Sequence, residues 1–267
     1  MDIAPLSLII VPLDGSVLAE RALKPAEELA AHSGTAVLLL SSRFGPDDGS
    51  SIQSLRRIAA SLTVPSEVAV IEDRLAHNAI LDAANAKPGA LVVMGTHGRG
   101  GAGQMLLGST AEEVVRHLDQ PVLLVGPECS PSWSIGDARI IVCSDGSELS
   151  AAIASSVAFL TAQIDDSQLS IVQVVADEAR AHTQTIEDAM AACHLTATTQ
   201  VIHGDDPIAA ITELARTLPA AFIAMATHGH SGLQRLILGS TSAAMIRRAP
   251  CPVLVARPHD FFPSADS

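Results

Sequence analysis

The sequence repeats itself at a constant offset of 131 residues, and this repeat constrains the fold more than any other feature. Residues 95–125 and 226–256 are identical at 12 of 31 positions without a gap. The block 11–16 aligns with 142–147 at the same offset, and both blocks end in Asp-Gly-Ser. Because blocks that lie far apart share one offset, the chain is a tandem duplication of one domain.

The chain length agrees with two copies, because 267 residues are enough for two domains of ~100–150 residues each. Between the copies, residues 126–133 read Gly-Pro-Glu-Cys-Ser-Pro-Ser-Trp, a composition typical of a linker. We expect a first domain at residues 1–127, a second at 137–258, and a junction between residues 126 and 138. The duplication also predicts that an approximate twofold axis relates the two domains.

In each copy, short apolar runs alternate with stretches in which the apolar residues have the spacing of a helix. The expected strands are 8–13, 36–40, 68–71, 90–94 and 122–125 in the first copy, and 140–143, 169–175, 198–202, 222–225 and 253–256 in the second. Strands that alternate with helices indicate a parallel sheet covered by helices on both faces. The predicted fold class is therefore α/β, with two tandem five-stranded parallel sheets.

Composition excludes several classes of protein. The chain has 16 basic and 29 acidic residues, a net charge of −13 that would repel the phosphate backbone of a nucleic acid. Aromatic residues make up only 2% and tyrosine is absent, so a stacking platform for single strands is not expected. No apolar run approaches the ~20 residues of a membrane span, and no basic leader suggests a signal peptide.

The four cysteines are scattered and form no CxxC pair; they are Cys129, Cys143, Cys193 and Cys251. This pattern indicates reduced thiols and disfavours disulfides and metal ligation. The ten histidines also lack the spacing of metal ligands. We therefore expect a cytoplasmic protein without a metal site and without a membrane or nucleic-acid partner.

The first candidate segment in each copy follows the first strand, where an open parallel sheet binds its ligands. It reads Asp-Gly-Ser at residues 14–16 and again at 145–147. An aspartate at this edge can accept hydrogen bonds from a ribose hydroxyl or an adenine amine. The single glycine does not make the Gly-x-Gly-x-x-Gly pattern of a dinucleotide site.

The second candidate segment follows the fourth strand. It reads Met-Gly-Thr-His-Gly at 94–98 and Met-Ala-Thr-His-Gly at 225–229, and leads to Gly-Ser-Thr at 108–110 and 239–241. Free N–H groups, the helix dipole and two hydroxyls at a helix start make a site for phosphate. In the alternative interpretation the glycines only permit turns and the serines only cap helices, and the residues alone leave both open.

These motifs resemble the ATP-binding signature of the universal stress protein family. The resemblance rests on Gly95-x2-Gly98-x9-Gly108-Ser109, on the opening Val-Pro-x-Asp-Gly-Ser, on Met-Gly-Thr-His-Gly, and on the closing Pro-Val-Leu-Leu-Val. It implies a doubly wound, adenine nucleotide alpha hydrolase-like fold with strand order 3-2-1-4-5 in each domain. It also implies that the two domains pair through their last strands, at 122–125 and 253–256.

The resemblance also assigns roles to single residues. Asp14 would be the acceptor on the adenosine side. The residues that would line the ribose and phosphates are Met94, Gly95 and Gly98, and those that would hold the phosphate tail are Gly108, Ser109 and Thr110. In the second copy the corresponding residues are Asp145, Met225, Gly229, Gly239, Ser240 and Thr241, together with Val174, which would cover the adenine.

Each copy departs from the family pattern. Ala226 stands where the signature has its first glycine, and its methyl group could crowd a nucleotide. Arg43 stands where an apolar residue usually lies beside adenine, and Gln104 stands where the family often has an arginine, as at Arg235. Because Gly95 lets the backbone approach a ligand and Ala226 does not, we expect tighter ATP binding in the first copy.

The resulting functional prediction is a cytoplasmic stress-response protein that binds ATP, with Mg²⁺ as a candidate counter-ion, or a related adenine nucleotide. It would act as a sensor or regulator, with slow or absent turnover, because no general base beside a positioned water is evident. Asp14, His97 and Ser109 supply the residue types of a hydrolase triad but lack its Gly-x-Ser-x-Gly turn. The alternatives are a stress-response scaffold that acts by dimerisation and a slow adenine-nucleotide hydrolase. Pairing inside the chain is expected, and a homodimer and a regulatory protein partner stay open.

Overall fold

The structure is a computed structural model that describes residues 5–96, 107–177, 181–218, 220–227 and 239–257. The elements of the first half are β1 (Leu8–Pro12), α1 (Val17–Glu20), α2 (Leu23–Ser33), β2 (Val37–Arg43), α3 (Ser50–Ala59), β3 (Ser66–Glu72), α4 (Ala76–Asn85), β4 (Ala90–Gly95), α5 (Ser109–His117) and β5 (Val122–Val125). Those of the second half are β6 (Arg139–Cys143), α6 (Glu148–Ala151), α7 (Ile153–Thr161), β7 (Gln168–Val175), α8 (Gln184–Ala192), β8 (Ala197–His203), α9 (Pro207–Thr217), β9 (Phe222–Ala226), α10 (Ser240–Arg248) and β10 (Val253–Ala256). All ten expected strands are present.

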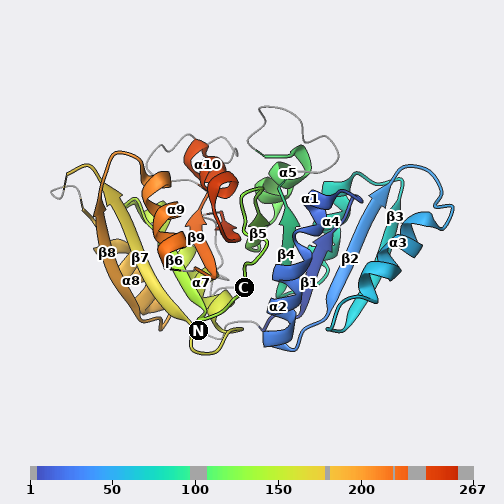
Figure 1. The fold of residues 1–267 in the computed structure, drawn as a ribbon, viewed down its shortest axis with the longest axis horizontal. Helices are drawn as coiled ribbons and strands as arrows, with labels where there is room; N and C mark the ends of the chain where they lie inside the picture. Colours follow the sequence, from blue (N-terminus) through green and yellow to red (C-terminus); the bar gives the residue numbers. More distant parts are fainter. Residues whose placement is uncertain (1–4, 97–106, 178–180, 219, 228–238, 258–267) are drawn as a thin grey trace, which may run out of the picture.

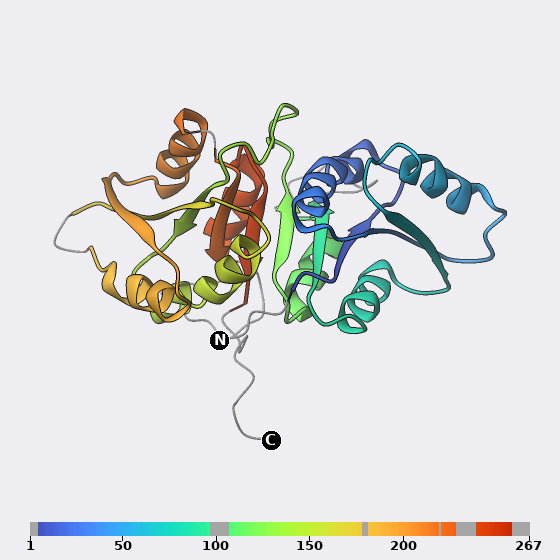
Figure 2. The same ribbon diagram turned by 90° about the horizontal axis from the view of Figure 1, so that it is seen from below.

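The strands form one ten-stranded sheet in the order β3-β2-β1-β4-β5-β10-β9-β6-β7-β8. Pairing within each half is parallel, and each half has the order 3-2-1-4-5, which confirms the predicted α/β fold. The strands of the two halves stay separate along the described sheet, side by side as Figure 1 shows. Helices cover both faces of the sheet, as the view from below in Figure 2 shows.

Burial on both faces explains the continuous apolar runs of the central strands. In β1, Ile9, Ile10 and Val11 are fully buried. The residues from Leu91 to Val93 in β4 are also fully buried. The small aliphatic residues that dominate the composition therefore form the core between the sheet and its helices. The edge strands β3 and β8 contain only half-buried and exposed residues, as expected where one side lacks a neighbouring strand.

The two halves join through an antiparallel pairing of β5 with β10. Leu123 pairs with Leu254, flanked by the pairs Leu124–Val253 and Val122–Val255. Leu123 and Leu254 are equivalent under the 131-residue offset, so the pseudo-twofold axis passes through this pair. The pairing that the family resemblance implied is present, and its register is symmetric with respect to the duplication.

The linker after β5 is bound tightly to both halves. The Ser130 N–H donates to the Pro250 carbonyl at 2.8 Å, and the Trp133 indole N–H donates to the Ala221 carbonyl at 2.7 Å. Further along, the Ile135 N–H donates to Glu28 Oε2 at 2.7 Å. A segment held at three points in this way is a strap across the junction and not a flexible spacer.

Arg257, just after β10, caps a helix of the other half. Its guanidinium donates to the carbonyl oxygens of Leu118 at 3.1 Å and Arg116 at 2.8 Å, and it pairs with the Asp119 carboxylate. These carbonyls end α5, where unpaired acceptors and the negative end of the helix dipole favour a cation. Arg257 therefore stabilises both α5 and the junction.

Replacing Arg257 with alanine should lower the free energy of unfolding by ~1–3 kcal/mol, because charge-assisted hydrogen bonds to nearly buried carbonyls are lost. Urea unfolding followed by circular dichroism measures this change. Arg74→Ala is the control, since its ion pair with Asp82 is solvent-exposed and worth ~0–1 kcal/mol. Equal losses in the two variants would contradict the capping role.

Candidate functional site

The candidate site lies at the carboxyl edge of the sheet, where β1 and β4 end in the first half and β6 and β9 end in the second. Figure 1 shows this edge uppermost, with α5 and α10 close to it. Helices leave the sheet in opposite directions at these ends, which is the position where doubly wound sheets bind ligands.

The Asp-Gly-Ser segment after β1 forms a fixed turn. Asp14 Oδ1 accepts the Ser16 N–H at 2.9 Å, Gly15 has a left-handed φ of 80°, and Ser16 Oγ accepts the Ala19 N–H at 3.1 Å. The serine thereby caps α1, while the aspartate uses one carboxylate oxygen to hold the turn. The half-buried Asp14 stands at the edge of the sheet as predicted.

The second copy builds the same turn after β6. Asp145 Oδ1 accepts both the Ser147 N–H at 3.0 Å and the Ser147 hydroxyl at 2.5 Å, and Gly146 has a φ of 84°. Asp145 itself is exposed. The repeated motif is therefore a conserved geometry within this chain, and its turn-forming role holds with or without a ligand.

The structure gives Gly95 a different role from the one expected. A Cβ added there would lie 2.7 Å from the Leu18 carbonyl oxygen and 3.1 Å from the Ala19 Cα, both in the backbone of α1. The absence of a side chain thus lets α1 pack against the end of β4. In the second copy, Ala226 accommodates its methyl group in a buried position with 7% exposure. The structure therefore does not support the idea that Gly95 favours tighter binding by letting the backbone approach a ligand.

Both helices that were expected to hold phosphate begin as predicted. Gly108 and Gly239 have extended backbones before α5 and α10, and neither supplies a side-chain cap. The Gly108 N–H donates to the Thr96 carbonyl at 2.7 Å, and the Gly239 N–H donates to the Thr227 carbonyl at 3.2 Å. Each helix start is thereby fixed to the end of the neighbouring strand.

The first turn of α5 directs N–H groups toward the edge of the sheet. The first intrahelical donor is Glu112, whose N–H donates to the Gly108 carbonyl at 2.9 Å. The N–H groups of Ser109, Thr110 and Ala111 therefore lie ahead of the first helical hydrogen bond. In α10 the same geometry applies to residues 240–242, because the Ala243 N–H donates to the Gly239 carbonyl at 2.9 Å. Such a helix start suits an anion.

The methionines of the motif belong to the core. Met94 is 4% exposed and Met225 is 8% exposed, so only their backbones are available at the edge. A chain of contacts connects the other first-copy candidates: the Asp14 turn leads into α1, α1 packs on Gly95, and the next residue, Thr96, accepts the Gly108 N–H. These contacts bring the described first-copy candidates to the same edge of the sheet.

The ends of β2 and β7 differ between the copies. Arg43 donates to Asp47 Oδ1 at 2.5 Å and to Ser51 Oγ at 3.3 Å. Desolvation raises the pKa of Asp47, but hydrogen bonds from the Ile52 and Ser51 N–H groups outweigh it and hold the pKa below its usual value. The positive charge of Arg43 is therefore neutralised within its own loop, whereas Val174 leaves the equivalent position in the second copy apolar.

Sequence reasoning missed one feature of the second copy. The buried Gln173 accepts the His182 N–H through Oε1 at 2.9 Å. A Cβ on Gly146 would lie 3.0 Å from Gln173 Nε2 and 3.0 Å from the His182 Cβ, so the segment after β7 crosses the Asp145 turn. The only available signal was a glutamine inside an apolar strand. His182 therefore packs against Gly146, the residue next to Asp145.

The predicted Gly98 and Gly229 lie outside the described residues, as do His97, Gln104 and Arg235. Within the described ranges, no three histidine, cysteine or acidic side chains gather in a way that could hold a metal ion. Within the same ranges, no helix has the length and apolar character needed to span a membrane.

Comparison with known proteins matches the chain to a family model described as "Universal stress protein family", at residues 42–126 and 138–257. A universal stress protein from Mycobacterium tuberculosis is 28% identical over 235 residues, which cover 77% of this chain and 71% of that protein. One from Thermus aquaticus is 42% identical over 74 residues, covering 27% of this chain and 54% of the relative.

Among solved structures, a universal stress protein from Archaeoglobus fulgidus superposes with a TM-score of 0.67 at 22% identity. The superposition covers 94% of this chain and 98% of that one. At this identity the likeness shows the fold and leaves function to the chemistry of the site.

Proposed function

Because this chain belongs to the universal stress protein family, we propose that it binds an adenine nucleotide, ATP foremost, and acts as a nucleotide-dependent sensor or regulator in the stress response. The binding site would be the carboxyl edge of the first half, with Asp14 toward the adenosine and the start of α5 toward the phosphates. Turnover would be slow or absent. We also propose residues 1–127 and 137–258 as the limits of the two domains.

One observation carries the proposal: the helix start at Gly108 is joined through Thr96 to the strand end beside the Asp14 turn. The Gly108–Thr96 hydrogen bond of 2.7 Å places three N–H groups of α5 at the same edge as a carboxylate that stays half-buried. Phosphates suit the N–H groups and the helix dipole, and ribose hydroxyls or the adenine amine suit the carboxylate. A ligand with an anion at one end and hydrogen-bond donors at the other matches this pair.

Magnesium would enter this site with the phosphates. Mg²⁺ usually keeps several waters and binds through substrate phosphates with one or two carboxylates.

The first half is also the proposed site of higher affinity, although for a new reason. In the second half, His182 packs against Gly146 of the Asp145 turn. In the first half, Arg43 is held by Asp47 and need not enter the adenine position. We therefore keep the expected order of affinities.

A thermal-shift titration with ATP tests the proposal. Saturation at a hundred times the dissociation constant should stabilise the protein by ~2.7 kcal/mol through mass action. Asp14→Asn keeps the oxygen that accepts the Ser16 N–H but removes the charge, so it should remove most of the shift without unfolding α1. Asp145→Asn is the matched control in the other half and should leave most of the shift intact.

The scaffold alternative has support of its own, because Gly95 and the Asp-Gly-Ser turns have structural roles that need no ligand. The absence of any shift with millimolar ATP in the wild-type protein would favour that alternative. Sustained release of ADP over many turnovers would favour the hydrolase.

A further inference from the structure

A cavity of about 140 Å³ lies at the junction of the two halves. Its walls come from α1 and α2, from the end of β5 and from the strap after β5. It is partly open to solvent. It is much smaller than a triphosphate nucleotide, and its lining includes none of the proposed nucleotide-site residues Asp14, Gly95, Gly108 and Ser109.

Rigid apolar groups form most of the wall. Trp133 is only 6% exposed, and its ring is fixed by the hydrogen bond to Ala221 and by an edge-to-face contact with Phe222 at 5.5 Å between centroids. Pro25 and Val125 complete this side and are buried. Apolar cavities of roughly 150 Å³ accept molecules the size of benzene. The wall and the volume therefore suit one small planar ring.

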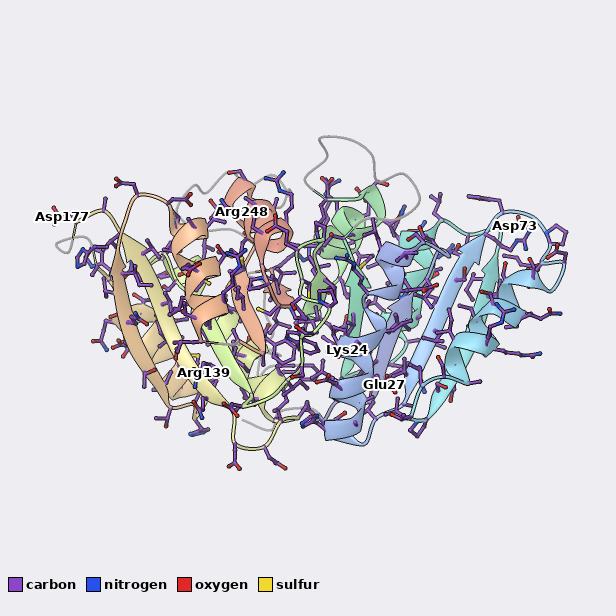
Figure 3. All side chains as sticks on the ribbon, in the orientation of Figure 1. Lys24, Glu27, Asp73, Arg139, Asp177 and Arg248 are labelled. Atoms are coloured by element: carbon purple, nitrogen blue, oxygen red, sulfur yellow. The ribbon has the colours of Figure 1, made fainter. Side chains whose placement is uncertain are left out.

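The rim carries two cationic side chains on a protein whose total charge is −13. Arg21 and Lys24 lie there beside the carboxylate of Glu20, and the Glu28 carboxylate is within ion-pair distance of Lys24. Lys24 Nζ lies 4.0 Å from Glu28 Oε1, a long contact, and the other oxygen of Glu28 already accepts the Ile135 N–H. Lys24 is therefore able to turn toward a ligand. Figure 3 places it near the middle of the molecule, close to where the halves meet.

The thiol in the wall adds no negative charge. Burial raises the pKa of Cys129 to about 11, although Arg21 and Lys24 both act to lower it. At neutral pH the thiol is protonated, so it does not compete with an anion from solution for the two cations. Their influence on this thiol also agrees with their position on the cavity.

From this arrangement we propose that the junction cavity binds a small planar monocarboxylate, with its ring against Trp133 and its carboxylate at Lys24 and Arg21. One carboxylate can accept hydrogen bonds from both cations of the rim, and a neutral thiol and indole suit the ring. A charge-assisted hydrogen bond to Lys24 supplies the selectivity for an anion over a neutral ring.

Benzoate is the probe, and the fluorescence of Trp133 is the readout. Trp133 is the single tryptophan and the chain has no tyrosine, so the emission comes from the wall of the cavity itself. We expect a saturable change with benzoate and at least ~tenfold weaker binding of benzamide, which has the same ring without the charge. Calorimetry should give one benzoate per chain.

The two lysines of the chain provide matched variants. Lys24→Gln should weaken benzoate binding about tenfold, because the cation on the rim is lost. Lys87→Gln, at the end of α4, should leave it unchanged. Arg21 is a poorer choice for this test, since its guanidinium also donates to the Pro127 carbonyl and holds the strap.

Three results would each overturn the proposal. The first is the absence of a saturable change in fluorescence at about 10 mM benzoate, a concentration above the dissociation constant of even a weak complex. The others are equal binding of benzamide and equal weakening by both lysine variants. The titrations contain no nucleotide, so their outcome is independent of the ATP experiment.

Discussion

Gly126→Ala should lower the free energy of unfolding by about 3 kcal/mol or more, the largest effect that we expect from adding one methyl group. Gly126 follows β5, and a Cβ there would lie 1.9 Å from the carbonyl oxygen of Ile246 and 3.0 Å from its carbonyl carbon. Both atoms belong to the backbone of α10, so no side chain can rotate away. Relief requires α10 to move from β5, at the junction of the halves. Urea unfolding gives the free energy, and thermal unfolding should show a drop of ~2–4 °C for each kcal/mol.

Gly204→Ala is the matched control. A Cβ on Gly204 would meet only Val174 Cγ1 at an ordinary 3.9 Å, and its φ is not in the left-handed region. This change should alter the stability by less than ~1 kcal/mol. If the two variants lost similar amounts of stability, close packing of α10 on the junction would not be the reason for the glycine.

Gly126 also illustrates what a single sequence does not reveal. In the sequence it begins a stretch rich in proline and serine, and such a glycine indicates a turn. Its actual constraint comes from Ile246, a residue far along the chain, and only the fold brings them together. By contrast, the family resemblance implied that the last strands of the two copies pair, and the structure has this pairing, with Leu123 opposite its own equivalent Leu254.

The candidate site also has features that the sequence predicts and one that it does not. The turns at Asp14 and Asp145 and the helix starts at Gly108 and Gly239 depend on local chemistry, and the structure has them where the motifs predicted. The segment at His182 also packs against the second site, and the sequence contains almost no signal for this contact. A motif therefore locates the edge of a site more reliably than it describes the space inside.

Gly95→Ala should lower the free energy of unfolding by ~1–3 kcal/mol, because its Cβ would lie 2.7 Å from the Leu18 carbonyl and push α1 from the end of β4. ATP binding to the first half should weaken as a consequence, since α1 follows the Asp14 turn. The unfolding free energy and the ATP affinity should therefore fall together. Urea unfolding and calorimetry on the same preparation measure the two quantities.

Ala226→Gly at the equivalent position of the second half separates packing from ligand approach. If packing decides which residue stands here, removing the buried methyl costs ~1 kcal/mol of stability and does not improve ATP binding. If the methyl group instead blocks the nucleotide, the same change strengthens binding in the second half, and Gly95→Ala weakens binding in the first half without loss of stability. The structure favours the first outcome, because the atoms nearest to a Cβ on Gly95 are those of α1.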